Sequence, residues 1–328
     1  MIKILIVGYG SIGKRHLENF SQFKNTEFII YTKRKDLQSL EKIGVKISDS
    51  LSECLREKPE IGIITNETSL HIPIAIKLAK EGIDLFLEKP LSHSLKDVKR
   101  LQAIVKDKKL ITQMGCNFRF HPCIEKIKSL IDKQSIGRVI SAQVQSCSYL
   151  PDYHPEENYE KGYAARKDLG GGVILTQIHE IDYMYWFFQD VKNVIGVSGK
   201  FSDLDITAED YASCLLEFKN GVHGELHLDY FQRPNLRSCK IRGTKGEIYW
   251  DSDKNQVNTY NIRKKRWKTK LEIKNYDINL SYIKQLKHFL KCVKQRKESI
   301  NNLEQGVTTL KIALAIKKAS STMKNVNI

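Results

Sequence analysis

The chain begins with a strand, a glycine-rich turn and a helix start: Met1-Ile2-Lys3-Ile4-Leu5-Ile6-Val7-Gly8-Tyr9-Gly10-Ser11-Ile12-Gly13. The apolar, β-branched run ends at Gly8, and Gly8, Gly10 and Gly13 then stand in the order G-x-G-x-x-G. In this context the glycines allow a tight turn, a close backbone approach to a pyrophosphate, and close packing of the helix on the strand. The amides of Ser11 and Ile12 open the helix, whose N-terminus favours phosphate. The stretch therefore predicts a dinucleotide site.

The composition places the chain among two-domain globular proteins. It has 328 residues, and no apolar run has the ~20 residues that would span a bilayer. The seven cysteines form no C-x-x-C pair, which favours reduced thiols and a cytoplasmic location. The net charge is +16, but the lysines are spread over many segments, so we expect neither a nucleic-acid partner nor a membrane partner.

The two parts of the chain differ in the order of their predicted helices and strands. Up to about residue 115, strand-like runs alternate with helical ones, which predicts a Rossmann-type, doubly wound parallel sheet in a domain spanning 1–120. The predicted strands are Ile2–Val7, Glu27–Tyr31, Ile61–Thr65, Asp84–Leu87 and Leu110–Met114. From 121 to 328 strands follow one another, with a hairpin signal at Asn220-Gly221, so we expect an α+β domain with an open, mainly antiparallel sheet.

Two constellations carry candidate chemistry. Glu88-Lys89-Pro90 follows a strand, and ligands of doubly wound folds bind at the carboxyl ends of strands, so Lys89 is a candidate acid–base. The second runs from the triple glycine at 170–172 into a predicted helix that ends at Phe188. There Thr176, His179 and Asp182 are spaced three apart and would share one face. We predict that His179 exchanges protons with a substrate or orients it.

These motifs, with Gly115-Cys116-Asn117-Phe118-Arg119-Phe120, resemble the Gfo/Idh/MocA oxidoreductase family over nearly the whole chain. The resemblance implies a nicotinamide cofactor, a sugar or cyclitol substrate, and a subunit contact through the face of the second sheet. It also implies that Lys89 and His179 are the catalytic residues. Many members carry an aspartate where this chain has Thr176, and a threonine cannot exchange protons at neutral pH. Further cofactor contacts are predicted at Thr65, Asn66, His71, Glu88, Lys89 and Asn117.

A polar, aromatic loop between Ser148 and Lys167 precedes the triple glycine. Its tyrosines can stack on sugar rings, and its arginine can pair with a carboxylate or phosphate. The loop also contains His154 and resembles a branch of the family associated with bacterial surface-polysaccharide sugars. The predicted substrate-binding residues are Arg119, Tyr149, Tyr153, Tyr163, Arg166, Thr176 and His179.

The second predicted strand decides the expected cofactor. NAD-selective sites place a carboxylate at the end of this strand, whereas this chain has Thr32, Lys33 and Arg34. A hydroxyl and two cations suit a 2′-phosphate, so we favour NADP(H) and keep NAD(H) as the alternative.

Three functions remain open at this point. The favoured one is hydride transfer between a nicotinamide and a carbinol or carbonyl carbon of a sugar or sugar derivative, including a nucleotide sugar. The alternatives are a glycoside hydrolase that uses NAD transiently and a non-catalytic regulatory protein. We expect a homodimer or homotetramer through the second sheet. We expect no metal site, because His223, Glu225, His227 and Asp229 follow one another along one strand face, where in-line side chains diverge.

Overall fold

A computed structural model describes residues 1–42, 44–153 and 155–328, and they form two compact units. The first unit contains Met1–Cys116 and Tyr282–Thr308, and the second contains Asn117–Ser281 and Thr309–Ile328. The first boundary lies four residues before the predicted one at 120. The sequence prediction assigned everything after 120 to the second domain, whereas the structure returns Tyr282–Thr308 to the first. The reason is hydrophobic: Leu286 and Phe289 are buried in the core of the first unit.

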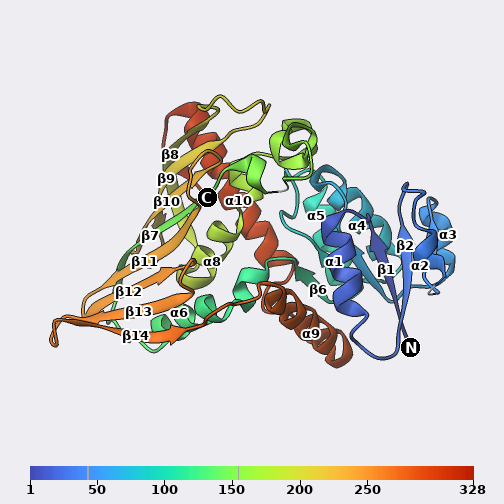
Figure 1. Cartoon of the computed structure of the whole chain (residues 1–328), viewed down its shortest axis with the longest axis horizontal. Helices are drawn as coiled ribbons and strands as arrows, with labels where there is room; N and C mark the ends of the chain where they lie inside the picture. The colour runs from blue at the N-terminus through green and yellow to red at the C-terminus, as the bar shows by residue number, and fades with distance from the viewer. Residues whose placement is uncertain (43, 154) are drawn as a thin grey trace. The chain divides into compact units, whose positions relative to one another are not determined.

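The first unit is built on a six-stranded parallel sheet in the order β3-β2-β1-β4-β5-β6. Figure 1 labels β1, β2 and β6 of this sheet. The strands are β1 (Ile2–Val7), β2 (Thr26–Tyr31), β3 (Lys46–Ser48), β4 (Ile61–Ile64), β5 (Asp84–Leu87) and β6 (Thr112–Met114). The helices are α1 (Ser11–Phe20), α2 (Gln38–Glu41), α3 (Leu51–Arg56), η1 (Thr68–Leu70), α4 (His71–Lys80), α5 (Val98–Asp107) and α9 (Asn279–Gln295). The strand order reverses between β1 and β4, which is where doubly wound folds bind their ligands.

Five of these strands match the predicted runs, and β3 is an addition of three residues. The match follows from burial on both faces: β1, β4 and β5 are mostly apolar, with buried residues such as Ile4, Ile6, Ile63 and Phe86. The doubly wound fold is therefore confirmed.

The second unit contains a nine-stranded sheet in the order β14-β13-β12-β11-β7-β10-β9-β8-β15 (Figure 1). All neighbouring strands are antiparallel except β7 and β10, which run parallel. The strands are β7 (Val139–Cys147), β8 (Val191–Gly199), β9 (Tyr211–Phe218), β10 (His223–Asp229), β11 (Leu236–Gly243), β12 (Gly246–Asp251), β13 (Gln256–Asn261), β14 (Arg266–Glu272) and β15 (Val326–Asn327). The predicted hairpin at Asn220-Gly221 joins β9 to β10, as expected.

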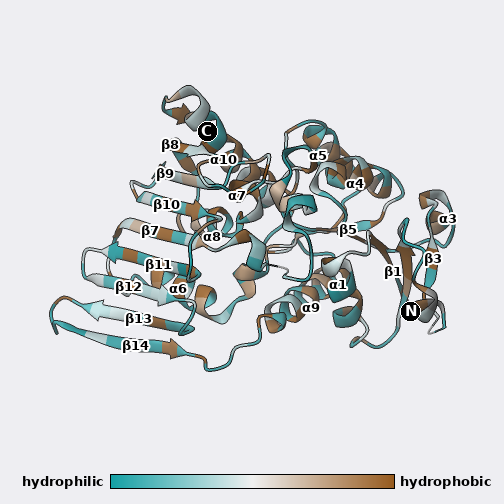
Figure 2. Ribbon diagram, turned by 45° about the horizontal axis from the view of Figure 1, so that its top comes forward, coloured by the Kyte–Doolittle hydropathy of each residue, from teal (hydrophilic) through white to brown (hydrophobic). Residues whose placement is uncertain are grey.

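Helices of this unit are α6 (Pro122–Asp132), α7 (Val173–Thr176), α8 (His179–Phe188) and most of α10 (Leu303–Thr322), with short turns η2 (Asn117–Phe120), η3 (Leu150–Asp152), η4 (Tyr159–Lys161), η5 (Tyr163–Ala165) and η6 (Lys167–Leu169). One sheet face packs on helices; Gly224 lies so close to Met184 of α8 that a Cβ would come within 2.5 Å of its methyl carbon. The opposite face carries exposed apolar side chains, Ile195, Val197 and Leu215. Figure 2 shows apolar and polar residues mixed along the strands of this sheet.

In the part of the chain that the structure describes, no helix combines the length and apolarity needed to cross a membrane.

Candidate functional site

The glycine turn after β1 has one position that the protein itself leaves open. Gly8 has φ +91°, and a Cβ there would lie 2.8 Å from the Asn66 amide nitrogen. A Cβ at Gly13 would lie 2.4 Å from the Gly8 carbonyl oxygen. At Gly10, by contrast, a Cβ would meet no described atom within 4 Å. Folding therefore requires Gly8 and Gly13, whereas the space at Gly10 suits a pyrophosphate next to the amides of Ser11 and Ile12.

The two residues after β4 lie against this turn: Thr65 holds it in place, and Asn66 places an amide beside it. The Thr65 hydroxyl lies 3.0 Å from the Val7 carbonyl oxygen and 2.9 Å from that of Gly8. Its hydrogen bond is shared between these two acceptors. Both polar atoms of the Asn66 side chain are buried and have no partner among the described residues. A buried, unpaired amide is costly. The cofactor contact predicted for Asn66 therefore has a structural basis, whereas Thr65 acts by anchoring the turn.

His71, the first residue of α4, joins two loops at this edge of the sheet. Its Nδ1 lies 2.9 Å from the Pro90 carbonyl oxygen, and its Nε2 lies 2.9 Å from that of Asn66. Burial lowers the pKa of His71, and the carbonyl contacts oppose that shift. Its side chain is thus used to position Asn66 and the Lys89-Pro90 turn.

The Glu88 carboxylate is buried beneath that same turn. Its Oε1 lies 2.6 Å from Nε2 of His16, and its Oε2 accepts the Lys89 amide at 3.1 Å. A Cβ at Gly115 would lie 2.7 Å from this carboxylate, so the glycine makes room for it. Glu88 therefore orients the backbone of Lys89, whose own side chain is partly exposed.

Tyr282 lies in the same unit, beside this group of charged residues. The guanidinium carbon of Arg15 lies 4.9 Å from the centre of its ring, and the His16 ring lies 6.2 Å away. Burial raises the pKa of the Tyr282 hydroxyl most; the Glu88 carboxylate raises it further, while Lys89 and Arg15 lower it. Tyr282 is thus close enough to Lys89 to respond to its charge.

The end of β2 carries the three residues predicted to select the cofactor. Thr32 is buried, and its hydroxyl accepts the Arg34 amide at 3.2 Å. The Arg34 guanidinium donates to the Tyr9 carbonyl oxygen inside the glycine turn at 2.9 Å, while Lys33 is exposed. One cation, Arg34, therefore contacts the glycine turn.

In the second unit, the triple glycine is packed by the protein itself. A Cβ at Gly171 would lie 2.0 Å from the Tyr163 carbonyl oxygen, and one at Gly172 would lie 2.3 Å from the Glu209 carboxylate. The amides of Gly171 and Gly172 donate to the carbonyls of Arg166 and Ala164. The glycines therefore fix the preceding loop, and their backbone is packed against other parts of the protein.

The single helix predicted from the triple glycine to Phe188 is wrong. The structure has a short α7 that ends at Thr176 and a separate α8 that begins at His179. Thr176 and His179 therefore belong to different helices and share no helix face. Both side chains are nearly buried, and the His179 ring packs at 5.0 Å on that of Phe118.

Arg119, which we predicted to contact the substrate, is instead buried in an ion pair. It has no exposed surface, and its Nε and Nη2 donate to the two oxygens of Asp182, each at 2.8 Å. The Thr309 hydroxyl donates to the same carboxylate. A buried bidentate pair is costly to break, so Arg119 stabilises the packing of η2 on α8. Asn117, two residues earlier, has a buried amide with no partner among the described residues, as at Asn66.

The break between α7 and α8 exposes a residue that the sequence interpretation missed. Gln177 donates from Nε2 to the Tyr153 hydroxyl at 2.9 Å and to the Asp229 carbonyl oxygen at 3.2 Å. Its own Oε1 is buried without a partner among the described residues. Tyr153 also bonds Ser148 at 2.8 Å, and burial raises its pKa. Tyr153 and Gln177 thus form one hydrogen-bonded group beside Thr176.

The other predicted substrate residues of this loop make contacts of a different kind. The Tyr149 ring stacks against the Arg233 guanidinium, with 4.0 Å from its carbon to the ring centre. Tyr163 is exposed, and Arg166 is paired with Asp168 on the surface. His154 lies outside the described residues.

Behind His179, a charged pair supports its ring. The Glu180 carboxylate has no exposed surface and lies 2.9 Å from Nε of Arg237. The Arg237 guanidinium carbon lies 4.5 Å from the centre of the Phe118 ring, on which His179 packs. Neither His16 nor Arg237 was predicted, since each gains its role from a partner far away in sequence.

Comparisons with known proteins agree with both units. Residues 2–116 match the model of the oxidoreductase family with an NAD-binding Rossmann fold, and residues 124–249 match that of the GFO/IDH/MocA C-terminal domain. The myo-inositol 2-dehydrogenase of Thermotoga maritima is 26% identical, with 100% of this chain and 98% of that protein aligned. The scyllo-inositol 2-dehydrogenase (NAD(+)) of Bacillus subtilis is 25% identical, with 99% and 94% aligned.

Solved structures show the same fold. A levoglucosan dehydrogenase in complex with NADH superimposes with a TM-score of 0.90 at 17% identity and covers 100% of this chain and 99% of its own. The resemblance noted from the motifs is thus confirmed over both units. The two matched models together span most of the chain, and the chain belongs to the Gfo/Idh/MocA family.

Proposed function

We propose that this protein is a nicotinamide-dependent dehydrogenase that interconverts a carbinol and a carbonyl on a sugar or cyclic polyol. The observation that carries the proposal is the open space at Gly10, in a turn whose other two glycines are closed by the protein. The inositol dehydrogenases among its relatives support the polyol class.

The residues present fit a nicotinamide dinucleotide. The open cradle at Gly10 and the unpartnered buried amide of Asn66 both lie at the carboxyl edge of the parallel sheet. When bound, the nicotinamide accepts or donates the hydride. The chain's own part is to bind and orient the substrate and to move the hydroxyl proton, for which Lys89 and His179 are the proposed groups.

The surroundings of Lys89 and His179 are compatible with proton transfer. The Glu88 carboxylate holds the Lys89 backbone at the carboxyl end of β5, and the Lys89 side chain is partly exposed there, where it would meet a substrate hydroxyl. The His179 ring is fixed against Phe118, which Arg237 and Glu180 support from behind. Thr176 has no carboxylate, so these two residues would share the proton transfer.

Cofactor selectivity is a finer proposal. Lys33 and Arg34 favour a 2′-phosphate and hence NADP(H), whereas one relative is named for NAD(+) and the levoglucosan dehydrogenase was solved with NADH. Titrating NAD⁺ and NADP⁺ into the wild type and into Arg34→Ala separates these options. Tighter NADP⁺ binding that weakens in Arg34→Ala supports the proposal, and tighter NAD⁺ binding by the wild type refutes it.

The reaction is tested with a panel of inositols, free sugars, anhydrosugars and nucleotide sugars, monitored by net formation of reduced cofactor. Stoichiometric turnover on one member supports a dehydrogenase. Glycoside cleavage without net reduction would point to the hydrolase, and tight cofactor binding without turnover on any member would point to a regulatory protein. The panel also tests the finer prediction of a surface-polysaccharide precursor. The proposed homodimer or homotetramer is tested separately below.

A further inference from the structure

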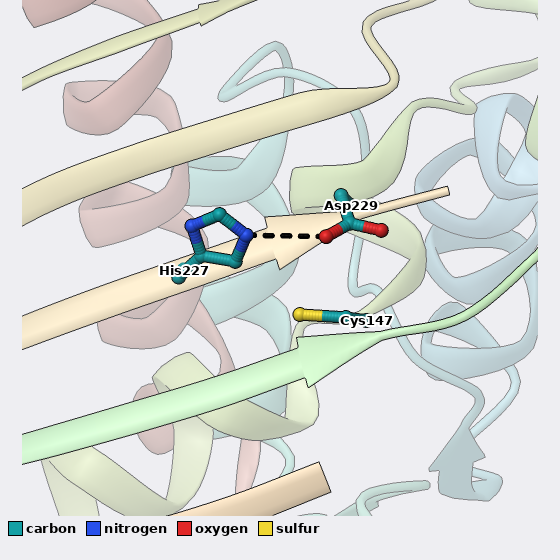
Figure 3. A group of neighbouring side chains, drawn as sticks. All are labelled: Cys147, His227 and Asp229. Atoms are coloured by element: carbon teal, nitrogen blue, oxygen red, sulfur yellow. Dashed lines mark hydrogen bonds and ion pairs between the residues drawn. The ribbon is translucent and has the colours of Figure 1, made fainter. Parts of the chain in front are cut away.

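Three different metal-ligating side chains meet on the open face of the second unit's sheet. Cys147 ends β7 and Asp229 ends β10, and the parallel register pairs these two residues. His227 precedes Asp229 by two residues on the same strand face. One ligand atom from each of the three lies within 4.8 Å of the other two. Figure 3 shows the Cys147 sulfur beside the contact between His227 and Asp229.

The spacing suits a small tetrahedral ion. His227 Nε2 lies 3.1 Å from Asp229 Oδ2. Zinc bonds to nitrogen and oxygen are about 2.0–2.2 Å long, so two ligands of a tetrahedral ion lie roughly 3.4 Å apart. Only small side-chain movements would thus bring the nitrogen, the oxygen and the sulfur around one centre.

The ligands are oriented by groups around them. The second Asp229 oxygen, Oδ1, accepts the amides of Phe231 at 3.1 Å and Gln232 at 2.9 Å, which turns Oδ2 toward His227. The Tyr211 ring meets the His227 ring edge-on, with their centres 5.3 Å apart. Such outer contacts are typical of metal sites because they fix the donor atoms in place.

Access comes from one side. Cys147 and Asp229 are buried, whereas about a third of the His227 side chain is exposed. His227 also lines a depression of about 670 Å³ on this sheet face, together with Gln145, Tyr211, Ser213 and Glu225. A metal held by the three side chains would keep its fourth position toward this depression.

We propose that Cys147, His227 and Asp229 bind a divalent transition metal of the zinc class, with water as the fourth ligand. The thiol loses its proton to solvent as the sulfur binds the ion. A thiolate with an imidazole selects zinc or cobalt over magnesium or calcium. The site lies outside the cofactor and proton-transfer residues, so it goes beyond the proposed dehydrogenase function. The sequence indicated no metal because it showed only one strand, whereas the sulfur comes from the neighbouring strand.

The test uses the full chain without a histidine tag, stripped with a chelator and titrated with Zn²⁺ by calorimetry and with Co²⁺ by absorption. We expect one ion per chain and a cobalt–thiolate charge-transfer band. Cys147→Ser should abolish the band, and His227→Gln, at a partly exposed position, should weaken binding at least tenfold. Cys54→Ser, which removes a buried thiol of the first unit, should change neither.

Absence of stoichiometric binding would overturn the proposal. It would equally fail if the band persisted in Cys147→Ser, or if His227→Gln, checked for folding by circular dichroism, bound Zn²⁺ as tightly as the wild type. Because these readouts need neither cofactor nor substrate, they are independent of the dehydrogenase assay.

Discussion

His16 Nε2 lies 2.6 Å from Glu88 Oε1, and both side chains are almost completely buried. This contact joins two parts of the cofactor domain that are 72 residues apart. His16 belongs to α1, the helix that begins at the glycine turn, and Glu88 precedes Lys89 and holds its amide. The helix that follows the glycine turn and the turn that carries the proposed acid–base are therefore connected by a direct side-chain contact.

We expect His16→Ala to destabilise the protein, because it leaves the buried Glu88 carboxylate without this partner. Loss of a partner for a buried polar group costs about 1–3 kcal/mol, and more for a charged one. His16→Gln, which retains a donor, should recover part of the loss. Urea unfolding of the three proteins measures this. If His16→Ala were as stable as the wild type, the contact would contribute nothing to the fold.

At Gly10 we expect a loss of binding without a loss of stability. A Cβ there meets no described atom within 4 Å, and its φ of −83° is open to any residue. Gly10→Val should therefore fold normally and fail to bind the dinucleotide in calorimetry. Gly13→Ala is the contrasting variant, since its Cβ would lie 2.4 Å from the Gly8 carbonyl oxygen and should lower the melting temperature. Normal cofactor affinity in Gly10→Val would show that the pyrophosphate does not bind at Gly10.

The fold was predictable where one local pattern sufficed. The apolar runs of β1, β4 and β5 and the Asn220-Gly221 turn each have a single structural solution. The return of α9 to the first unit was not predictable, because its helical pattern does not say which core buries Leu286 and Phe289. The break after Thr176 was hidden for a similar reason, since Gln177 and Ile178 are compatible with a helix.

The candidate site was predictable only in part. Motif spacing predicts roles for Gly10, Lys89 and His179, which remain predictions. It also assigned Arg119 to the substrate, whereas Asp182 binds Arg119 in the interior. The supporting residues were missed because their partners are remote: Glu88 for His16, and Glu180 for Arg237. Such pairs leave no local sequence pattern, so they can be recognised only in the folded structure.

Stability should fall in mild acid because of His121. Burial, with a smaller contribution from Arg237, lowers its pKa from 6.5 to about 4. The unfolded chain therefore binds a proton at higher pH than the folded one, so stability is full above about pH 6.5 and is lost as the pH falls toward 4. The loss from this residue is about 3 kcal/mol. Its Nδ1 also accepts the Cys123 amide at the start of α6, which only the unprotonated nitrogen can do.

His121→Asn retains a helix-capping side chain and removes the titration. Urea unfolding at a series of pH values from 7 to 4 should show a shallower decline for this variant than for the wild type. Parallel curves would mean that another group controls the acid response.

The open face of the second sheet should carry a subunit contact. Leu215 is 57% exposed and Ile195 is 48% exposed, next to each other on β9 and β8. Leu215→Glu places a charge in this apolar surface and should dissociate the proposed homodimer or homotetramer. Ile262→Glu changes a residue of similar exposure, 49%, at the β13–β14 turn and should leave the mass unchanged. Light scattering decides, and a monomeric wild type at micromolar concentration would refute the contact.

The proton-transfer proposal makes the sharpest kinetic prediction. Removing a general acid–base typically costs about 10²–10⁴-fold in rate, so Lys89→Ala and His179→Ala should each lower turnover by that order. Cofactor affinity should stay within a few-fold, because neither side chain forms the glycine turn. Since the His179 ring packs on Phe118, His179→Gln serves as a variant that keeps most of the packing volume. Steady-state assays on the identified substrate, with a cofactor titration alongside, measure both quantities. Near-normal turnover in Lys89→Ala would refute the mechanism even though the family assignment would stand.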